Sequence, residues 1–101
     1  MRLFQSVAAV VLFLLATDAS AGVREDAIAA HDRKDFADVL RLLHVLADEK
    51  DSWGMLHLGH VYASGEGVVA DLVEAAKWYR KAAEQGDASA QYSLARAYDV
   101  G

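Results

Sequence analysis

Apolar side chains recur along most of the chain with the spacing of one face of a helix, not with the alternation of a strand. In the segment 52–64, Met55, Leu58 and Tyr62 fall on one side. In the segment 71–85, one set of positions is apolar and the opposite set is charged: Leu72, Ala75, Ala76, Tyr79 and Ala83 against Glu74, Lys77, Lys81 and Glu84. The pattern predicts an all-α protein.

Capping residues and glycine turns divide this pattern into separate helices. Asp71 is a good N-cap, Gly65 and Gly67 can adopt positive φ and turn the chain, and Gly86 can end a helix. No proline interrupts the chain. We therefore expect five helices with approximate bounds 23–33, 35–49, 52–64, 71–85 and 88–100. The short connections between them imply antiparallel neighbours.

The first residues have the layout of a secretory signal peptide. Arg2 is followed by the apolar run from Val7 to Ala16, and small residues stand at Ala19 and Ala21, where a signal peptidase needs them. A membrane-spanning helix needs about 20 apolar residues, and this run is much shorter. We expect cleavage after Ala21, which leaves no stable membrane anchor; retention of the segment is the weaker alternative.

The chain repeats itself at an offset of 36 residues. This shift places Leu58, Tyr62 and Gly65 on Leu94, Tyr98 and Gly101, and it also aligns the pairs 35–36 with 71–72 and the segments 47–49 with 83–85. The unit is therefore present three times: the copy over 52–87 is complete and the other two are partial.

The complete copy strongly resembles the Sel-one-like repeat, the 36-residue relative of the tetratricopeptide repeat. The matching residues are Leu58, Gly59, Tyr62, Gly65, Gly67, Val68, Asp71, Ala75, the run 78–88, Ala90 and Gln91. The resemblance implies an α-solenoid of antiparallel helix pairs. It divides residues 22–101 into an N-terminal helical hairpin or partial repeat (22–51), a complete repeat (52–87) and the start of a further repeat (88–101).

One residue departs from the repeat pattern. Gly54 stands where alanine is usual, and glycine costs up to about 1 kcal/mol relative to alanine inside a helix. We expect the helix over 52–64 to be less rigid for this reason.

Charge and cysteine content narrow the classes of partner. The 101 residues are 54% hydrophobic and 25% charged, which is typical of a globular chain, and the net charge is −5. An acidic chain with no cluster of Lys and Arg is a poor ligand for nucleic acid or for an anionic membrane surface. The absence of cysteine excludes disulfides and thiol catalysis.

Stacked helix pairs offer an inner surface to ligands, and the first helix of each pair lines it. If Met55, Leu58 and Tyr62 face neighbouring helices, the adjacent stripe is a candidate for binding a peptide. It comprises, with its equivalents in the next repeat, Trp53, Leu56, His60, Ser89, Tyr92 and Arg96. Arg96 or His60 could meet a carboxylate or a backbone carbonyl there.

Catalytic and metal sites have weaker support. His57 and His60 lie three residues apart on one helix and His44 could approach them, but no motif supplies further ligands, so solvated histidines are the simpler interpretation. The serines at 52, 64, 89 and 93 lack a glycine-flanked nucleophile turn. No cofactor and no reaction are predicted.

These observations predict an exported helical-repeat protein, periplasmic or secreted, that binds a protein or peptide as an adaptor or scaffold and is not an enzyme. Two alternatives remain open. Some secreted relatives are associated with cell-wall or β-lactam chemistry, which would make the chain a cell-envelope hydrolase, although those relatives are rich in cysteine. The chain could also be a truncated piece of a longer array without a function of its own.

Overall fold

The computed structural model describes residues 19–100, so most of the predicted signal segment lies outside the described residues. The described part consists of five helices without a strand: α2 (Ala19–Asp32), α3 (Phe36–Asp48), α4 (Ser52–Ser64), α5 (Leu72–Glu84) and α6 (Ala88–Val100). The predicted all-α class and the five helices are confirmed. The largest difference is at α2, which begins at Ala19, so the expected cleavage position after Ala21 falls within its first turn.

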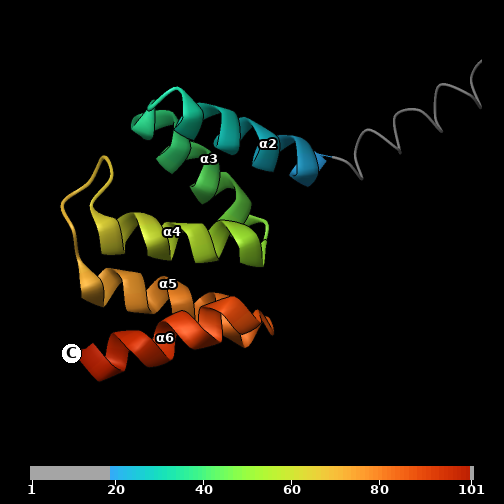
Figure 1. Cartoon of the computed structure of the whole chain (residues 1–101). Coiled ribbons are helices and arrows are strands. Elements are labelled where there is room, and N and C mark those ends of the chain that lie inside the picture. The colour runs from blue at the N-terminus through green and yellow to red at the C-terminus, as the bar shows by residue number, and fades with distance from the viewer. Residues whose placement is uncertain (1–18, 101) are drawn as a thin grey trace, which may run out of the picture.

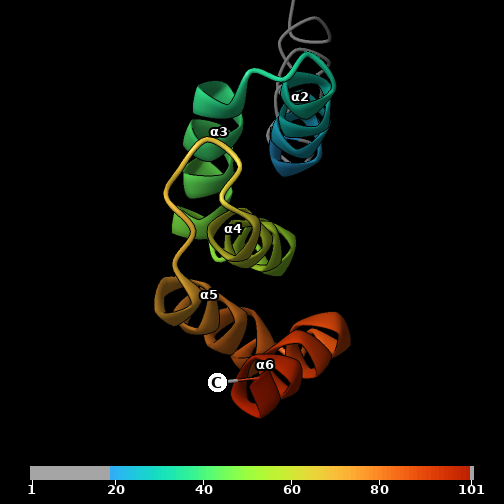
Figure 2. The ribbon, with the colours of Figure 1, turned by 60° about the vertical axis from the view of Figure 1, so that its left-hand side comes forward.

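The helices stack in chain order, and each packs mainly against the one before and the one after it (Figure 1). Seen from the second direction, α2, α4 and α6 lie on one side of the stack and α3 and α5 on the other (Figure 2). This is the two-layer arrangement expected of an α-solenoid.

Four aspartates start the four helices from α3 to α6. The carboxylates of Asp35, Asp51, Asp71 and Asp87 each accept a hydrogen bond from a backbone N–H two or three residues further on, at 2.9 to 3.2 Å. Such caps satisfy N–H groups that have no partner within the helix. At the 36-residue offset, Asp35 corresponds to Asp71 and Asp51 corresponds to Asp87. The capping aspartates therefore follow the repeat.

Three of the turns are short and of one type. The second residue after each of these helices has positive φ: Lys34 at 60°, Lys50 at 64° and Gly86 at 90°. Around Lys50, the N–H of Lys50 donates to Ala47 and the N–H of Asp51 donates to Leu46, which is the Schellman pattern. The aspartate that completes this pattern also caps the next helix, so one three-residue turn both ends and starts a helix.

The α4–α5 connection is longer and carries the glycine pair. Gly65 and Gly67 both have φ of 78°, and the N–H of Asp71 donates to the carbonyl oxygen of Tyr62 at 2.8 Å, which closes the loop. A Cβ at Gly67 would lie 2.5 Å from the Cβ of Phe36. Glycine is therefore needed here both for its backbone conformation and because the loop lies directly on the start of α3.

The core runs continuously from α2 to α6, and Leu43, Leu46 and Leu58 are its largest fully buried side chains. Gly54 and Gly59 allow α4 to approach its neighbours closely. A Cβ at Gly54 would lie 2.5 Å from the Cβ of Leu46, and a Cβ at Gly59 would collide with the ring of Tyr79. Gly54 is thus a contact between α3 and α4, which accounts for the missing alanine better than the loss of rigidity expected from the sequence.

The contact at Gly54 yields a stability prediction. We expect Gly54→Ala to lower the free energy of unfolding by about 1–3 kcal/mol, because the added methyl group overpacks the α3–α4 contact. Urea denaturation followed by circular dichroism measures the change. Gly22→Ala is the matched control, since nothing lies within 4 Å of a Cβ at that position. Equal stability of the two variants would contradict the packing argument.

Candidate functional site

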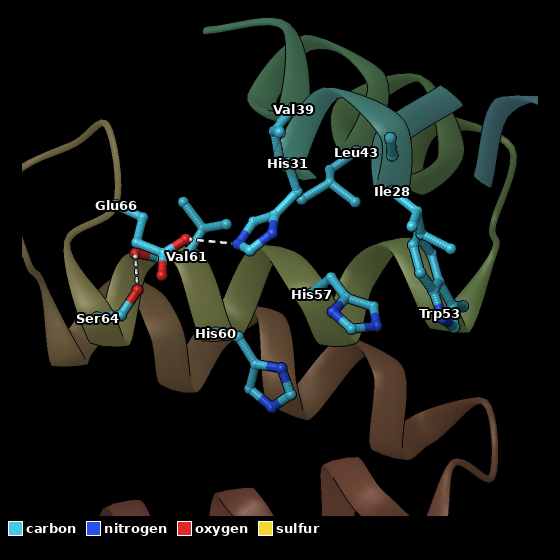
Figure 3. Close-up of a pocket in the computed structure, with 11 residues that line it drawn as sticks. Ile28, His31, Val39, Leu43, Trp53, His57, His60, Val61, Ser64 and Glu66 are labelled. Atoms are coloured by element: carbon cyan, nitrogen blue, oxygen red, sulfur yellow. Dashed lines mark hydrogen bonds and ion pairs between the residues drawn. The ribbon is translucent and has the colours of Figure 1, made fainter. Parts of the chain in front are cut away.

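A largely apolar cavity of about 360 Å³ lies between α2 and α4, with α3 forming its base (Figure 3). Its lining comes from α2, α3, α4 and the loop after α4: Ala27, Ile28, His31, Val39, Leu43, Trp53, His57, His60, Val61, Ser64 and Glu66. A volume of this size lies near the lower end of the usual range for ligand pockets. The cavity therefore has room for side chains of a partner, not for a folded element.

Two side-chain pairs join α2 to the two ends of α4, and we call them the bridging pairs. At the start of α4, Nε and Nη2 of Arg24 lie 2.8 and 2.7 Å from Oδ2 of Asp51. Beyond its end, Nε2 of His31 lies 2.9 Å from Oε2 of Glu66 (Figure 3). One pair lies at each end of the cavity walls formed by α2 and α4. The two pairs therefore hold these walls together.

Asp51 is the more constrained member of the bridging pairs. Its side chain is only 5% exposed, whereas that of Arg24 is 45% exposed. One carboxylate oxygen accepts the N–H of Gly54 at 3.2 Å, and the other meets Arg24. A carboxylate that is buried to this extent requires such partners, because an unpaired buried charge is costly.

Aromatic rings follow one another along the cavity side of α4. The ring centroids of Trp53 and His57 are 4.0 Å apart, those of His57 and His60 are 5.4 Å apart, and His60 meets Tyr79 of α5 at 5.6 Å. The helix α4 contains no Asp, Glu, Lys or Arg. Its contribution to the cavity is thus aromatic and, when the imidazoles are neutral, uncharged.

The surroundings of the two imidazoles favour their neutral forms. Burial lowers the pKa of His57 below its usual value, and the positive charges of His60 and His31 lower it further, while Asp87 acts in the opposite direction. Burial also lowers the pKa of His60, again against the effect of Asp87. Both side chains are therefore mainly neutral at pH 7.

The six residues predicted to bind a partner are not all brought together. Trp53 and His60 line the cavity, whereas Leu56 is only 8% exposed and belongs to the core. The other three lie on α6 and do not line the cavity: Ser89, Tyr92 and Arg96. The guanidinium carbon of Arg96 lies 6.0 Å from the ring centroid of Tyr92, which is 66% exposed.

Sequence reasoning missed the wall that α2 provides. Ile28 and His31 lie upstream of the recognisable repeat, and Glu66 lies between the two glycines of the turn, where the sequence indicates only a change of chain direction. His57 was weighed only as a metal ligand, but its ring lies in the cavity beside Trp53. The signal that could have indicated this wall is the apolar spacing within α2, where Ala27 and Ala30 are buried and Ile28 stays 51% exposed.

No three His, Cys, Asp or Glu side chains come together as metal ligands within the described residues. His44 lies against Trp78, with ring centroids 5.6 Å apart, and does not approach His57 or His60 in the aromatic row. Among the described helices, none has the length and apolar character needed to cross a membrane.

The lowered pKa values predict how stability depends on pH. A histidine with a lowered pKa binds fewer protons folded than unfolded, so its contribution is complete above the unfolded pKa of about 6.5 and is lost as the pH falls below that value. We expect the free energy of unfolding to decrease between pH 7.5 and pH 5, and to decrease less in His57→Gln. Denaturant titrations at the two pH values measure this. The same decrease in both proteins would contradict the assignment to His57.

Comparison of the sequence with known protein families identifies a repeat in two segments of the chain. The Sel1 repeat model matches residues 54–87, which cover nearly all of α4, the glycine loop and α5, and matches again over residues 88–101. No curated protein and no solved structure matches the chain.

Proposed function

Because the chain belongs to the Sel1 repeat family, whose repeats generally mediate protein–protein interactions, we propose that it is an exported adaptor that binds a peptide segment of another protein in the cavity between α2 and α4. The observation that carries this proposal is the cavity itself. It is apolar, it lies between two helices on the same side of the stack, and it is open enough to admit side chains. That side is the one on which helical-repeat proteins usually bind their ligands.

The polar groups of the cavity support binding over catalysis. Glu66 is engaged by His31, and the hydroxyl of Ser64 donates to the carbonyl oxygen of Val61 at 3.3 Å. The Ser64 hydroxyl is therefore not hydrogen-bonded to a base, as an activated nucleophile would be. Sel1 repeats are also typically non-catalytic, so we propose no enzymatic activity.

Export is supported by the N-terminal sequence. The apolar run from Val7 to Ala16 and the small residues Ala19 and Ala21 have the order of a cleavable leader. We expect the protein recovered from the periplasm or the culture medium to begin at Gly22, which N-terminal sequencing tests. Recovery of the intact chain from the cytoplasm alone would overturn this part of the proposal.

Capture from an envelope extract tests the binding site. Ile28→Glu places a carboxylate on the apolar wall of the cavity, and we expect it to reduce capture of the bound protein on the order of tenfold or more, because that charge loses hydration without gaining a partner. The control is Val73→Glu, since Val73 is 69% exposed and does not line the cavity.

The outcome separates the cavity from other surfaces. Loss of capture with Ile28→Glu and retention with Val73→Glu supports the proposed site. Equal capture by both variants contradicts it. The double variant Tyr92→Ala, Arg96→Ala then decides whether the exposed residues of α6 bind the partner instead.

A further inference from the structure

We propose that the cavity between α2 and α4 holds two adjacent, uncharged apolar side chains of the partner, and that protonation of His57 and His60 releases them. The inference rests on the proposed function and adds to it the chemistry of the partner and a control by pH. Its support comes from the volume of the cavity, the charges of its lining and the position of the two imidazoles.

The volume sets the size of the occupant. An apolar protein cavity of about 150 Å³ is large enough to bind benzene. The cavity between α2 and α4, at about 360 Å³, has room for two groups of that size. Two neighbouring side chains such as leucine and phenylalanine fit this requirement, because adjacent residues of a bound segment stay within reach of one cavity.

At pH 7.5 the lining has no free charged group that could pair with a charged side chain. No lysine or arginine lines the cavity, and α4 contributes only uncharged side chains and imidazoles. The single carboxylate of the lining, Glu66, is already held by His31. A charged side chain of the partner would lose its hydration here without gaining an ion pair, so the cavity discriminates against it.

The bridging pairs keep this space in place. Arg24 and Asp51 fix one end of α4 to α2, and Asp51 is also the N-cap that starts α4. His31 and Glu66 fix the other end. The two pairs therefore join α2 to both ends of α4.

Acid converts the α4 wall of the cavity from neutral to positive. The titratable groups around His57 and His60 come from several elements. They are His31 of α2, Glu66 of the loop after α4, Tyr79 of α5 and Asp87, the N-cap of α6. The helix α3 contributes only the apolar Val39 and Leu43. Asp87 favours the charged imidazoles, but burial outweighs it, since the pKa of each histidine is lowered.

An apolar ligand removes further water from the two imidazoles. Ligand binding and protonation therefore oppose each other, and this opposition is reciprocal. We expect affinity for an apolar segment to fall by roughly tenfold or more between pH 7.5 and pH 5. The fall comes from His57 and His60, so it disappears when both are replaced by side chains that do not titrate.

The test uses the full chain and three terminally blocked dipeptides: acetyl-Leu-Phe-amide, acetyl-Leu-Glu-amide and acetyl-Leu-Lys-amide. Binding is followed by the NMR shifts of the Trp53 indole N–H, with the Trp78 indole as an internal control, because Trp78 does not line this cavity. We expect saturable shifts of Trp53 with the Leu-Phe peptide at pH 7.5, much weaker shifts with the two charged peptides, and weakened Leu-Phe binding at pH 5.

The double variant His57→Gln, His60→Gln separates the two parts of the inference. We expect its dissociation constants at pH 5 and pH 7.5 to be nearly equal, whatever their absolute value. An unchanged pH dependence in this variant overturns the release mechanism. Equally tight binding of a charged peptide, or no Trp53 shift with the Leu-Phe peptide up to its solubility limit, overturns the proposed occupant.

Failure here is distinguishable from failure of the proposed function. If the dipeptides do not bind but capture from extract still depends on Ile28, the cavity binds a partner of different chemistry and only this inference falls. If capture does not depend on Ile28, the proposed site itself is wrong.

Discussion

The buried carboxylate of Asp51 is the interaction on which the rest of the site depends. It starts α4 by accepting the N–H of Gly54, and it fixes α2 by accepting a hydrogen bond from Nε of Arg24 and forming an ion pair with Nη2 of the same residue. Among residues 22–97, Asp51 is the only charged residue that is buried. Burying a carboxylate is unfavourable by itself, and it is tolerated here because each oxygen has a donor. One residue thus fixes both the turn after α3 and one end of the cavity.

A second constraint acts on α4, which is the central helix of the stack. Gly54 and Gly59 allow it to contact α3 and the ring of Tyr79 on α5. Two glycines in thirteen residues make a poor isolated helix, since each costs up to about 1 kcal/mol relative to alanine. The stability of α4 therefore comes from packing on its neighbours. The same close packing leaves only its cavity-facing side for Trp53, His57 and His60.

Most of the fold was predictable because its signals are local. The aspartate caps, the glycine turn and the helical spacing are each contained in a few residues, and α3 to α6 begin and end within one residue of the expected positions. The stripe inferred from the sequence contained Trp53 and His60, which both line the cavity. The sequence also predicted Leu56 on this stripe, but Leu56 enters the core and His57 faces the cavity instead. The error is one residue, and consecutive residues differ by about 100° around a helix.

The α2 wall could not be predicted in the same way. Its position depends on Arg24 reaching Asp51 and on His31 reaching Glu66, contacts that span 27 and 35 residues of sequence. Neither pair belongs to the 36-residue pattern that identifies the repeat. The described chain also carries Lys34 and Lys50 at positive φ, where Gly86 stands in the later turn, so the glycine signal is weaker in the first half.

Apolar exposure alone does not identify the binding surface of this protein. Leu72 and Val73 at the start of α5 are 56% and 69% exposed, more than any apolar residue that lines the cavity. At the 36-residue offset, Leu72 corresponds to Phe36, which explains why an apolar residue stands at this position. The glycine loop covers Phe36 at Gly67. The exposed start of α5 is thus the counterpart of a surface that packs against the repeat at α3. The cavity differs because three helices line it, two bridging pairs join its walls and its lining carries imidazoles whose charge depends on pH, and these properties together support it as the proposed binding site.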